Sequence, residues 1–430
     1  MRRVWVYALT MAALLSLPME SLISARDRLI WEDQFDLAER SDQAFGITVS
    51  SRMAVAIGVG GTASGGLDLL MRAYNVKTGT LEWQDQRPLA SGIMTKVVID
   101  DVANRVFGAG YAANGPGTDF LVRAYDASTG DRLWEDVVDK GRDDFVQDIA
   151  AGKEGVFVVG YGGNVDGSPI ALLVRAYHKR TGDLLWEDQV NDGGDDVAAW
   201  QVKTEGGLVL VAGSMGHGPD QQLMLRAYDA RSGRLAWDSR VPQASPGVLA
   251  VDADRVYVSG SAVGTAGGSA VAFLAAYDLH AGNLLWQEWS VAASDVIRGL
   301  AVAGSQVFAT SDGTSLLRSH DVATGVLLWE DQTGSPNGAE DHAFGVDVGP
   351  DLVFVAGQRS VPFEYSEFLV RAYDRTSGEL VWEDSSHRSD SSFASGIAVK
   401  GPRVFAVGGT GMASPGIGTD FLIRAYAVGK

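Results

Sequence analysis

The chain contains no cysteine in its 430 residues. This absence excludes a disulfide framework, a thiolate zinc site, a c-type haem attachment and a thiol nucleophile. Basic residues are also few, because 35 Lys and Arg stand against 54 Asp and Glu, for a formal net charge of −19. Nucleic acids and anionic membrane surfaces require a basic face, so neither is expected as a partner. A cationic partner or a bound cation is compatible with this charge, and so is a solubilising role alone.

Long apolar runs are absent after residue 25. Before it, Arg2 and Arg3 precede an apolar run of 14 residues over 4–17, which is too short for a membrane span. Pro18 ends the run, and Ala25 offers a small residue for cleavage. The pattern is typical of a secretory signal peptide over 1–25, with an uncleaved anchor as the alternative. We therefore expect an exported protein, periplasmic or extracellular, with no transmembrane segment in its mature part, 26–430.

Glycine, by contrast, is abundant at 53 residues, and it recurs with tryptophan in a repeated segment. The clearest copy is LVRAYDASTGDRLWED, residues 121–136. Its first six residues alternate in polarity like a strand. Ser-Thr-Gly then predicts a turn in which Gly130 takes a positive φ, and a second strand carries Trp134. The segment is thus predicted to be a β-hairpin, with Arg123 pairing across it with Glu135 or Asp136.

Eight tryptophans mark copies of this hairpin, at intervals of 43 to 53 residues. They are Trp31, Trp83, Trp134, Trp186, Trp237, Trp286, Trp329 and Trp382. A period near 50 indicates a repeat architecture. Each period has room for four strands, which in the second period are predicted over 93–100, 105–110, 120–126 and 132–138. Four antiparallel strands per repeat are typical of a β-propeller blade, with the tryptophans packed between neighbouring blades.

The two ends of the chain predict how the ring closes. Residues 27–35 match the last strand of a blade, and 391–428 supply the first three strands. We therefore expect an all-β, eight-bladed propeller whose split blade joins the termini and removes free edges. The repeat before Trp329 is the shortest, and Ser319 and His320 replace its Ala-Tyr pair. A shortened loop between its second and third strands is expected, and all six histidines are interpreted as surface or loop residues.

The spacing of Ala124, Asp126, Thr129-Gly130 and Trp134 resembles the tryptophan-docking motif of pyrroloquinoline-quinone-type propellers, and similar copies cover 27–430. That family includes quinoprotein alcohol dehydrogenases and non-catalytic members, such as the propeller subunit of the machinery that inserts outer-membrane β-barrels. The resemblance implies, for the catalytic members, a calcium held by Glu and Asn, a catalytic Asp, a tryptophan beneath the quinone and commonly a disulfide.

These catalytic residues have no residue-by-residue match in this chain, and the disulfide is excluded. We therefore expect the non-catalytic type, with no catalytic residue and no bound pyrroloquinoline quinone. The alternative is a quinone- and calcium-dependent dehydrogenase of alcohols or sugars.

Candidate binding residues lie where the chain enters the first strand of each blade. Six of the eight entry loops carry an acid: Asp42, Asp144, Asp196, Asp295, Asp341 and Asp390. A ring of carboxylates at the channel mouth would bind calcium or a basic segment of a partner. Alternatively, each Asp caps its own loop by accepting backbone N–H bonds.

Aromatic residues add two further candidates on the same face. Trp200 lies in a predicted channel-facing strand, where it either stacks on a ligand or packs in the core. The loop 359–367, with Phe363 and Tyr365, is a candidate partner site. The sequence thus predicts a monomeric, non-catalytic scaffold that binds a protein partner or a small ligand.

Overall fold

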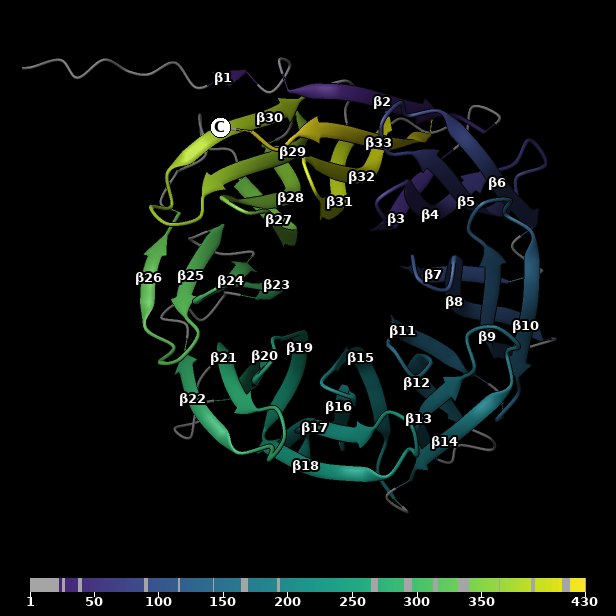
Figure 1. Ribbon diagram of the computed structural model, residues 1–430, viewed down its shortest axis with the longest axis vertical. Coiled ribbons are helices and arrows are strands. Elements are labelled where there is room, and N and C mark those ends of the chain that lie inside the picture. Colours follow the sequence, from purple (N-terminus) through teal and green to yellow (C-terminus); the bar gives the residue numbers. More distant parts are fainter. Residues whose placement is uncertain are drawn as a thin grey trace, which may run out of the picture.

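The fold is seen in a computed structural model. It describes residues 23–24, 28–37, 41–88, 92–114, 117–141, 143–163, 169–191, 194–263, 270–289, 296–311, 316–331, 340–362, 364–387, 391–411 and 418–429. Eight antiparallel sheets stand around a central channel, which confirms the predicted eight-bladed propeller (Figure 1). No helix within the described ranges is long and apolar enough to cross a membrane.

Each of the seven continuous blades has strands A to D in chain order, with A innermost and D outermost (Figure 1). Blade 1 contains β3 (Gln43–Val49), β4 (Met53–Gly61), β5 (Leu67–Asn75) and β6 (Leu81–Pro88). Blade 2 contains β7 (Ile93–Asp100), β8 (Arg105–Asn114), β9 (Gly117–Asp126) and β10 (Arg132–Val138). Blade 3 contains β11 (Phe145–Ala151), β12 (Val156–Gly163), β13 (Ile170–Tyr177) and β14 (Leu184–Val190). Blade 4 contains β15 (Val197–Glu205), β16 (Leu208–Met215), β17 (Gln222–Asp229) and β18 (Leu235–Pro242).

The second half of the ring continues this order. Blade 5 contains β19 (Ala244–Val251), β20 (Arg255–Val263), β21 (Ala270–Asp278) and β22 (Leu284–Trp289). Blade 6 contains β23 (Ile297–Ala303), β24 (Gln306–Ser311), β25 (Leu317–Asp321) and β26 (Leu327–Glu330). Blade 7 contains β27 (Glu340–Val348), β28 (Leu352–Val361), β29 (Tyr365–Asp374) and β30 (Leu380–Ser386). The remaining strands are β1 (Ile23–Ser24), β2 (Leu29–Phe35), β31 (Ser391–Lys400), β32 (Arg403–Gly411) and β33 (Thr419–Ala427).

The split blade closes the ring as predicted. The N-terminal β2 is strand D of the sheet formed by β31, β32 and β33. Leu29 pairs with Tyr426 at one end of the β2–β33 ladder, and Phe35 pairs with Phe421 at the other. One addition was not predicted: β1 pairs in parallel with Trp382 and Glu383 of β30, so blade 7 has a fifth, two-residue strand.

The repeated tryptophan joins each blade to the next one. Trp83 lies in strand D of blade 1, and its indole N–H donates to the carbonyl of Ala127, in the C–D turn of blade 2, at 2.9 Å. Gly130 of that turn has φ 76°, and a Cβ there would lie 2.7 Å from the Trp83 ring. Glycine is therefore required twice, for its backbone conformation and for the close approach of the ring. Six other blade junctions have the same indole bond, donated by Trp31, Trp134, Trp186, Trp237, Trp286 and Trp329.

A second contact between blades involves a tyrosine. The Tyr177 hydroxyl of strand C donates at 2.8 Å to Asp136, two residues after the tryptophan of the preceding blade. We call this bond the tyrosine latch. It occurs at six of the eight junctions, in the pairs Tyr74–Asp33, Tyr125–Asp85, Tyr177–Asp136, Tyr228–Asp188, Tyr373–Asp331 and Tyr426–Asp384. At the junction of blades 4 and 5, Ser239 of blade 4 stands where six other blades have the Asp that pairs with the tyrosine, here Tyr277. At the junction of blades 5 and 6, His320 replaces the tyrosine.

Blade 6 corrects two expectations. The segment between β24 and β25 spans residues 312–316, the same length as the segment 62–66 in blade 1, so the predicted loop shortening is wrong. The strands are shorter instead, since β24, β25 and β26 have six, five and four residues. His320, interpreted from the sequence as a surface or loop residue, lies within strand β25 and is largely buried.

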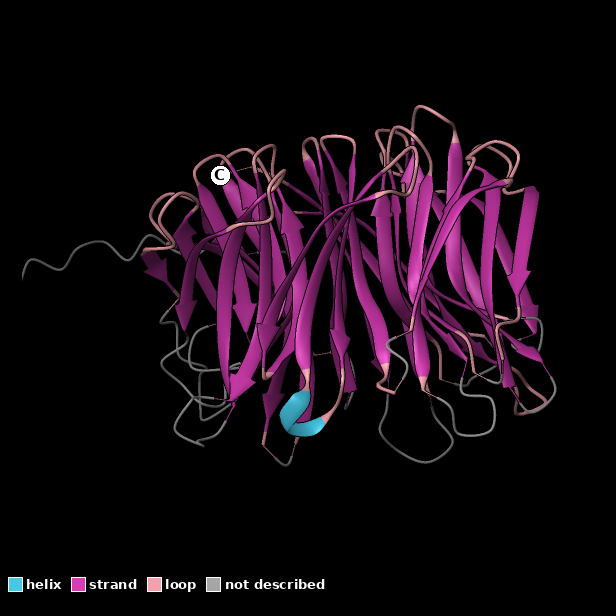
Figure 2. Ribbon diagram, turned by 90° about the horizontal axis from the view of Figure 1, so that it is seen from below, coloured by secondary structure: helices cyan, strands magenta, loops and turns pink. Residues whose placement is uncertain are grey.

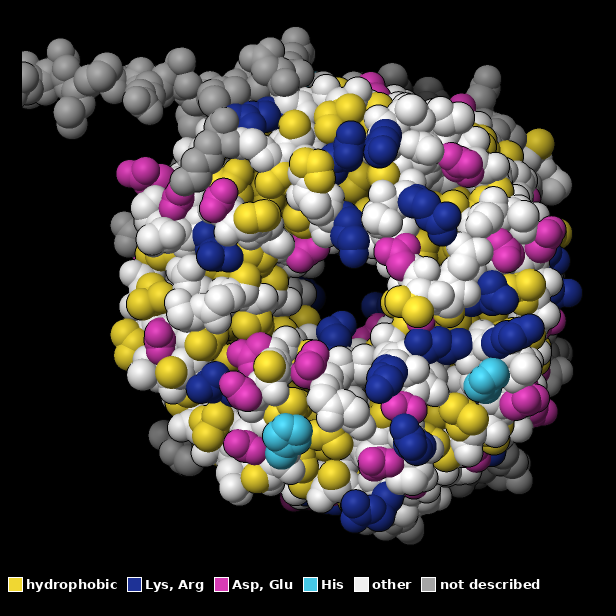
Figure 3. All heavy atoms as spheres, viewed as in Figure 1, with side chains coloured by type: hydrophobic (Ala, Val, Ile, Leu, Met, Phe, Trp, Pro, Cys, Tyr) yellow, Lys and Arg dark blue, Asp and Glu magenta, His cyan; other side chains and the backbone are white. Residues whose placement is uncertain are grey.

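The two faces of the ring differ. The A–B and C–D turns form one face, and the B–C and D–A connections form the other, which includes the short 3-10 helix η4 (Gly218–Asp220) (Figure 2). The turn face mixes Lys and Arg with Asp and Glu around an open channel (Figure 3). We call the opposite side the loop face. The described acids among those predicted at the strand entries, Asp42, Asp144, Asp196 and Asp341, lie there.

Candidate functional site

Two of the predicted acids are buried in the loop face. Asp42 and Asp144 have no exposed surface. The Asp42 carboxylate accepts the backbone N–H groups of Leu37 and Gly61, and that of Asp144 accepts those of Lys140 and Gly163. In both cases the carboxylate holds a D–A connection against the end of strand B, which is the loop-capping geometry.

Burial changes the acidity of these carboxylates. It raises the pKa of Asp42 to about 6, opposed by the two backbone bonds and assisted by the charges of Asp36 and Asp420. The pKa of Asp144 is also raised by burial. Both groups thus hold a proton more readily than an exposed aspartate.

The remaining predicted acids are arranged differently. Asp196 is exposed and accepts the backbone N–H of Ile170, from blade 3, at 2.9 Å. Asp341 is paired with arginines inside blade 7. Asp295, Asp390 and Phe363 lie outside the described residues. The loop face therefore gathers acids, but they do not form one uniform set, and the cation-binding ring stays a prediction.

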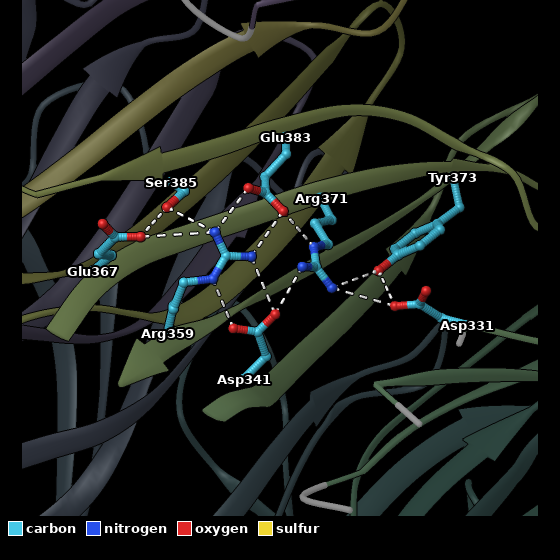
Figure 4. A network of polar contacts seen from close by, with 8 residues as sticks. All are labelled: Asp331, Asp341, Arg359, Glu367, Arg371, Tyr373, Glu383 and Ser385. Atoms are coloured by element: carbon cyan, nitrogen blue, oxygen red, sulfur yellow. Dashed lines mark hydrogen bonds and ion pairs between the residues drawn. The ribbon is translucent and has the colours of Figure 1, made fainter. Parts of the chain in front are cut away.

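Blade 7 contains a buried ionic network (Figure 4). Arg359 of strand B lies between Asp341 and Glu383, at 2.8 and 2.9 Å. Arg371 of strand C reaches the same two carboxylates, each at 2.7 Å. Burial alone would raise the pKa of Glu383, but the two guanidinium groups outweigh it and lower that pKa. Because Arg359 and Arg371 each pair with both Asp341 and Glu383, this network fastens the strands of blade 7 together.

The loop around this network places one other predicted residue. Tyr365 is half-buried at the start of β29 and packs edge-on against His387, with ring centroids 3.8 Å apart. Its ring therefore supports the D–A connection, and only part of it is exposed to a partner.

A group of three carboxylates lies between blades 2 and 3. Single oxygens of Asp119, Asp139 and Asp144 come within 4.8 Å of one another. Asp119 lies on strand C and Asp139 just after strand D of blade 2, whereas Asp144 precedes strand A of blade 3. Carboxylate oxygens are the ligands that calcium prefers, so this is the described group best suited to a hard cation.

Next to these acids, four aromatic rings form a continuous row. Tyr111 packs on Phe145 at 5.2 Å, Phe145 on Tyr161 at 5.6 Å, and Tyr161 on Trp200 at 5.8 Å between ring centroids. We call this row the aromatic stripe. It crosses blades 2, 3 and 4, and its last ring, Trp200, remains 37% exposed.

The position of Trp200 results from a local irregularity. In strand A of blade 4, Ala199 and Gln201 pair with consecutive residues of strand B, so Trp200 is the extra residue of a β-bulge. Phe45 has the same place in blade 1. Bulges redirect side chains next to binding sites. The Trp200 indole N–H is also fixed, by a 2.9 Å bond to the Ser214 hydroxyl.

The stripe with its acids does not fit pyrroloquinoline quinone. That cofactor carries three carboxylates, whereas Asp143 lies two residues before Phe145, and the exposed Asp196 immediately precedes strand A of blade 4. Like charges at such a site would repel the cofactor. The surface is better matched to a ligand that combines apolar and cationic groups, because rings and carboxylates both attract cations.

Sequence reasoning named Asp144, Asp196 and Trp200 here but missed Tyr111, Phe145 and Tyr161. Tyr111 and Tyr161 lie at matching places near the ends of strand B in consecutive blades. Placing the repeats in register would have brought them beside Trp200, because A strands of one blade pack against B strands of its neighbour.

Comparison with known proteins agrees with the observed architecture. A family model described as outer membrane protein assembly factor BamB matches residues 172–362. A search of the curated proteins finds no match.

Solved structures with the same fold cover nearly the whole chain. A quinohemoprotein alcohol dehydrogenase, ADHIIG from Pseudomonas putida HK5, is 13% identical with a TM-score of 0.59, over 95% of this chain and 77% of its own. A europium-containing methanol dehydrogenase is 12% identical with a TM-score of 0.61, over 94% of each chain. Chaetomium thermophilum Sqt1, bound to the N-terminus of ribosomal protein L10, is 14% identical with a TM-score of 0.58, over 90% of this chain and 98% of its own.

These neighbours include enzymes and a propeller that holds a segment of another protein, so at such identities they share the fold with this chain and nothing more. The recurring docking tryptophans, the closed ring and the family match lead to one classification. The chain is an eight-bladed β-propeller, and its residues 172–362 are similar to the family described as outer membrane protein assembly factor BamB.

Proposed function

We propose that the protein is an exported, non-catalytic scaffold that binds a protein partner or a small ligand on the loop face of its propeller. The observation that carries the proposal is the aromatic stripe, which ends in the exposed Trp200 and lies beside Asp143, Asp144 and Asp196. Tyrosine and tryptophan are the side chains that contribute most to binding at protein interfaces. Carboxylates around them steer and orient a partner of opposite charge.

The repeats differ from one another at this surface, and that difference supports a specific role for it. The bulge residue is Phe45 in blade 1, Gln147 in blade 3 and Trp200 in blade 4. Positions that only hold the ring together, such as the docking tryptophans, are instead repeated in every blade. Sqt1 bound to the N-terminus of ribosomal protein L10 is a precedent for a propeller that holds a segment of another protein.

Affinity capture from the envelope or secreted fraction of the producing cell tests the proposal. Trp200→Ala combined with Tyr161→Ala should lose the partners that the wild-type protein captures. Phe45→Ala is the matched control, since Phe45 is a bulge residue of strand A with the same 37% exposure. Equal capture by all three proteins would place binding elsewhere and overturn the proposal.

Export and oligomeric state are part of the proposal and have their own measurements. We propose cleavage after Ala25, which would remove Ile23 and Ser24 and with them strand β1. Mass spectrometry of the secreted or periplasmic protein would then find its N-terminus at residue 26. Light scattering should give the mass of one chain.

The alternative function is a quinone-dependent dehydrogenase, favoured by the two dehydrogenases among the structural neighbours. Purified protein mixed with calcium and pyrroloquinoline quinone tests it directly. On our proposal, no quinone absorbance is retained after desalting and no dye is reduced with alcohols or sugars. If the protein retained one equivalent of quinone and turned over alcohols or sugars, the dehydrogenase function would replace the scaffold function proposed above.

A further inference from the structure

The junction between blades 5 and 6 departs most from the repeat. Where six junctions pair a tyrosine hydroxyl with an aspartate, this one has His320 on strand C and Glu288 two residues after Trp286. An imidazole ring is shorter than a phenol, and it ends before the place that a tyrosine hydroxyl would reach. The strands of blade 6 are also the shortest of the ring, so they cover less of blade 5.

A cavity of about 200 Å³ lies at this junction. Its apolar wall includes Phe273, Trp289, Ile297 and Leu327, and its polar wall includes Glu288 and His320. Phe273 is fully buried and packs against Trp289 with ring centroids 5.5 Å apart, whereas Trp289 is 49% exposed. An apolar cavity of about 150 Å³ is large enough to hold benzene. The cavity at this junction therefore has room for one aromatic ring with a small substituent.

The polar wall offers hydrogen-bond acceptors. Nδ1 of His320 lies 2.9 Å from the carbonyl oxygen of Gly325, which can only accept, so Nδ1 carries the proton and Nε2 is an acceptor. Burial lowers the pKa of His320, which keeps the imidazole neutral. The Glu288 carboxylate accepts no hydrogen bond from any other described residue. Arg318 and Glu330 also line the cavity, and they are paired with each other at 3.2 Å.

We propose that this cavity binds a phenolic ring, with Phe273 and Trp289 against the ring and Glu288 accepting the hydrogen bond of its hydroxyl. The phenol supplies the two groups that six other junctions obtain from their own tyrosine, namely an aromatic ring and a hydroxyl donor to the carboxylate of the preceding blade. The chemistry is the same for a free phenol and for a tyrosine side chain of a partner.

Ligand-observed fluorine NMR titrations test the proposal with a matched pair of probes. Fluorophenol should bind saturably, and fluorobenzene, which lacks only the hydroxyl, should bind at least about tenfold more weakly, because a hydrogen bond to a charged group stabilises a complex by about 1.5–3 kcal/mol. N-acetyl fluorotyrosine amide is the third probe. If this amide binds as tightly as fluorophenol, the phenolic ring comes from a tyrosine of a partner. If the amide does not bind, the natural ligand is a free phenol. Equal binding of fluorophenol and fluorobenzene, or no saturable binding, would overturn the proposal.

Two variants locate the site. His320→Tyr restores the tyrosine of the repeat, so it should fill the cavity and abolish fluorophenol binding. Glu288→Gln should reduce the preference for fluorophenol over fluorobenzene while leaving fluorobenzene binding unchanged, which keeps the test valid if the first variant folds poorly. His280→Tyr, at an exposed turn of blade 5, is the control and should bind like the wild type. Unchanged binding in both test variants would show that the ligand lies elsewhere.

Discussion

The tyrosine latch shows how single residues connect blades that are covalently joined only at one edge. In the junction of blades 2 and 3, Asp136 accepts bonds from Tyr177 and from Arg175, at 2.8 and 3.2 Å. Arg175 also pairs with Glu187 of its own strand D. The arginine was predicted to pair across its hairpin, and this is confirmed for Arg123 with Glu135 and for Arg175 with Glu187. Its second bond, to the preceding blade, was not predicted.

Removing one hydroxyl measures what a latch contributes. Tyr177→Phe keeps the ring that packs on Trp134 and removes the bond that the hydroxyl donates to Asp136, together with the bond that it accepts from Arg175. We expect a loss of about 1.5 kcal/mol in the free energy of unfolding, because a hydrogen bond to a charged group is lost. Urea unfolding measures it. Tyr277→Phe is the control, since its hydroxyl has no hydrogen-bond partner among the described residues, and a similar loss in both variants would contradict the interpretation.

Asp42 gives the protein a predictable dependence on pH. Its pKa in the folded state, about 6, lies above the ordinary value of 3.8. The folded protein therefore binds this proton more tightly than the unfolded chain, and the resulting stability is complete below about pH 4 and lost as the pH rises through about 6. Urea unfolding of wild type and Asp42→Asn should show the wild type losing stability relative to the variant over this range. A difference that does not change with pH would contradict the assignment.

At the scale of the strands, local pattern predicts much but not contacts between blades. In blade 2, strands A and D were predicted over 93–100 and 132–138, and both bounds are confirmed. Strands B and C extend further, to Asn114 and from Gly117, because ladder pairing overrides the weak strand preference of glycine. The latch and the aromatic stripe join residues of different repeats, so identifying them requires that the repeats first be placed in register around the ring.

Blade 6 should be the least stable element of the ring. Its short strands make few ladder bonds, and it lacks a latch to blade 5. Amide hydrogen exchange should therefore be fastest in β23 to β26, because local opening there costs less than elsewhere. Blade 7, whose strands are held by the network of Arg359 and Arg371, provides the internal comparison. Protection in blade 6 equal to that in blade 7 would show that opening is governed by the whole ring.

At the scale of the whole molecule, the ring depends on a seam between the chain ends. Seven docking tryptophans donate their indole N–H to the C–D turn of the following blade, but Trp382 faces the split blade, where no such turn exists. Its Nε1 is buried and has no hydrogen-bond partner within the described residues. The corresponding acceptor would be the carbonyl of Val428, at the end of the chain. An unpaired buried N–H costs about 1–3 kcal/mol, so the seam is weaker than a continuous junction.

A circular permutant makes this cost measurable. The backbone N–H of Ala427 already donates to the carbonyl of Arg28 at 2.9 Å, so a C–D turn of the length found in blade 2 can join the two ends. New termini would be opened at Gly65, in the exposed B–C connection of blade 1. We expect the permutant to unfold at a higher temperature, because the new turn ties β33 to β2 and gives Trp382 an acceptor. Trp382→Phe separates the two effects: in the permutant it should remove part of the gain, whereas in the original chain, where the N–H is unpaired, it should cost less. Equal losses in both backgrounds would show that the indole bond contributes nothing to closing the ring.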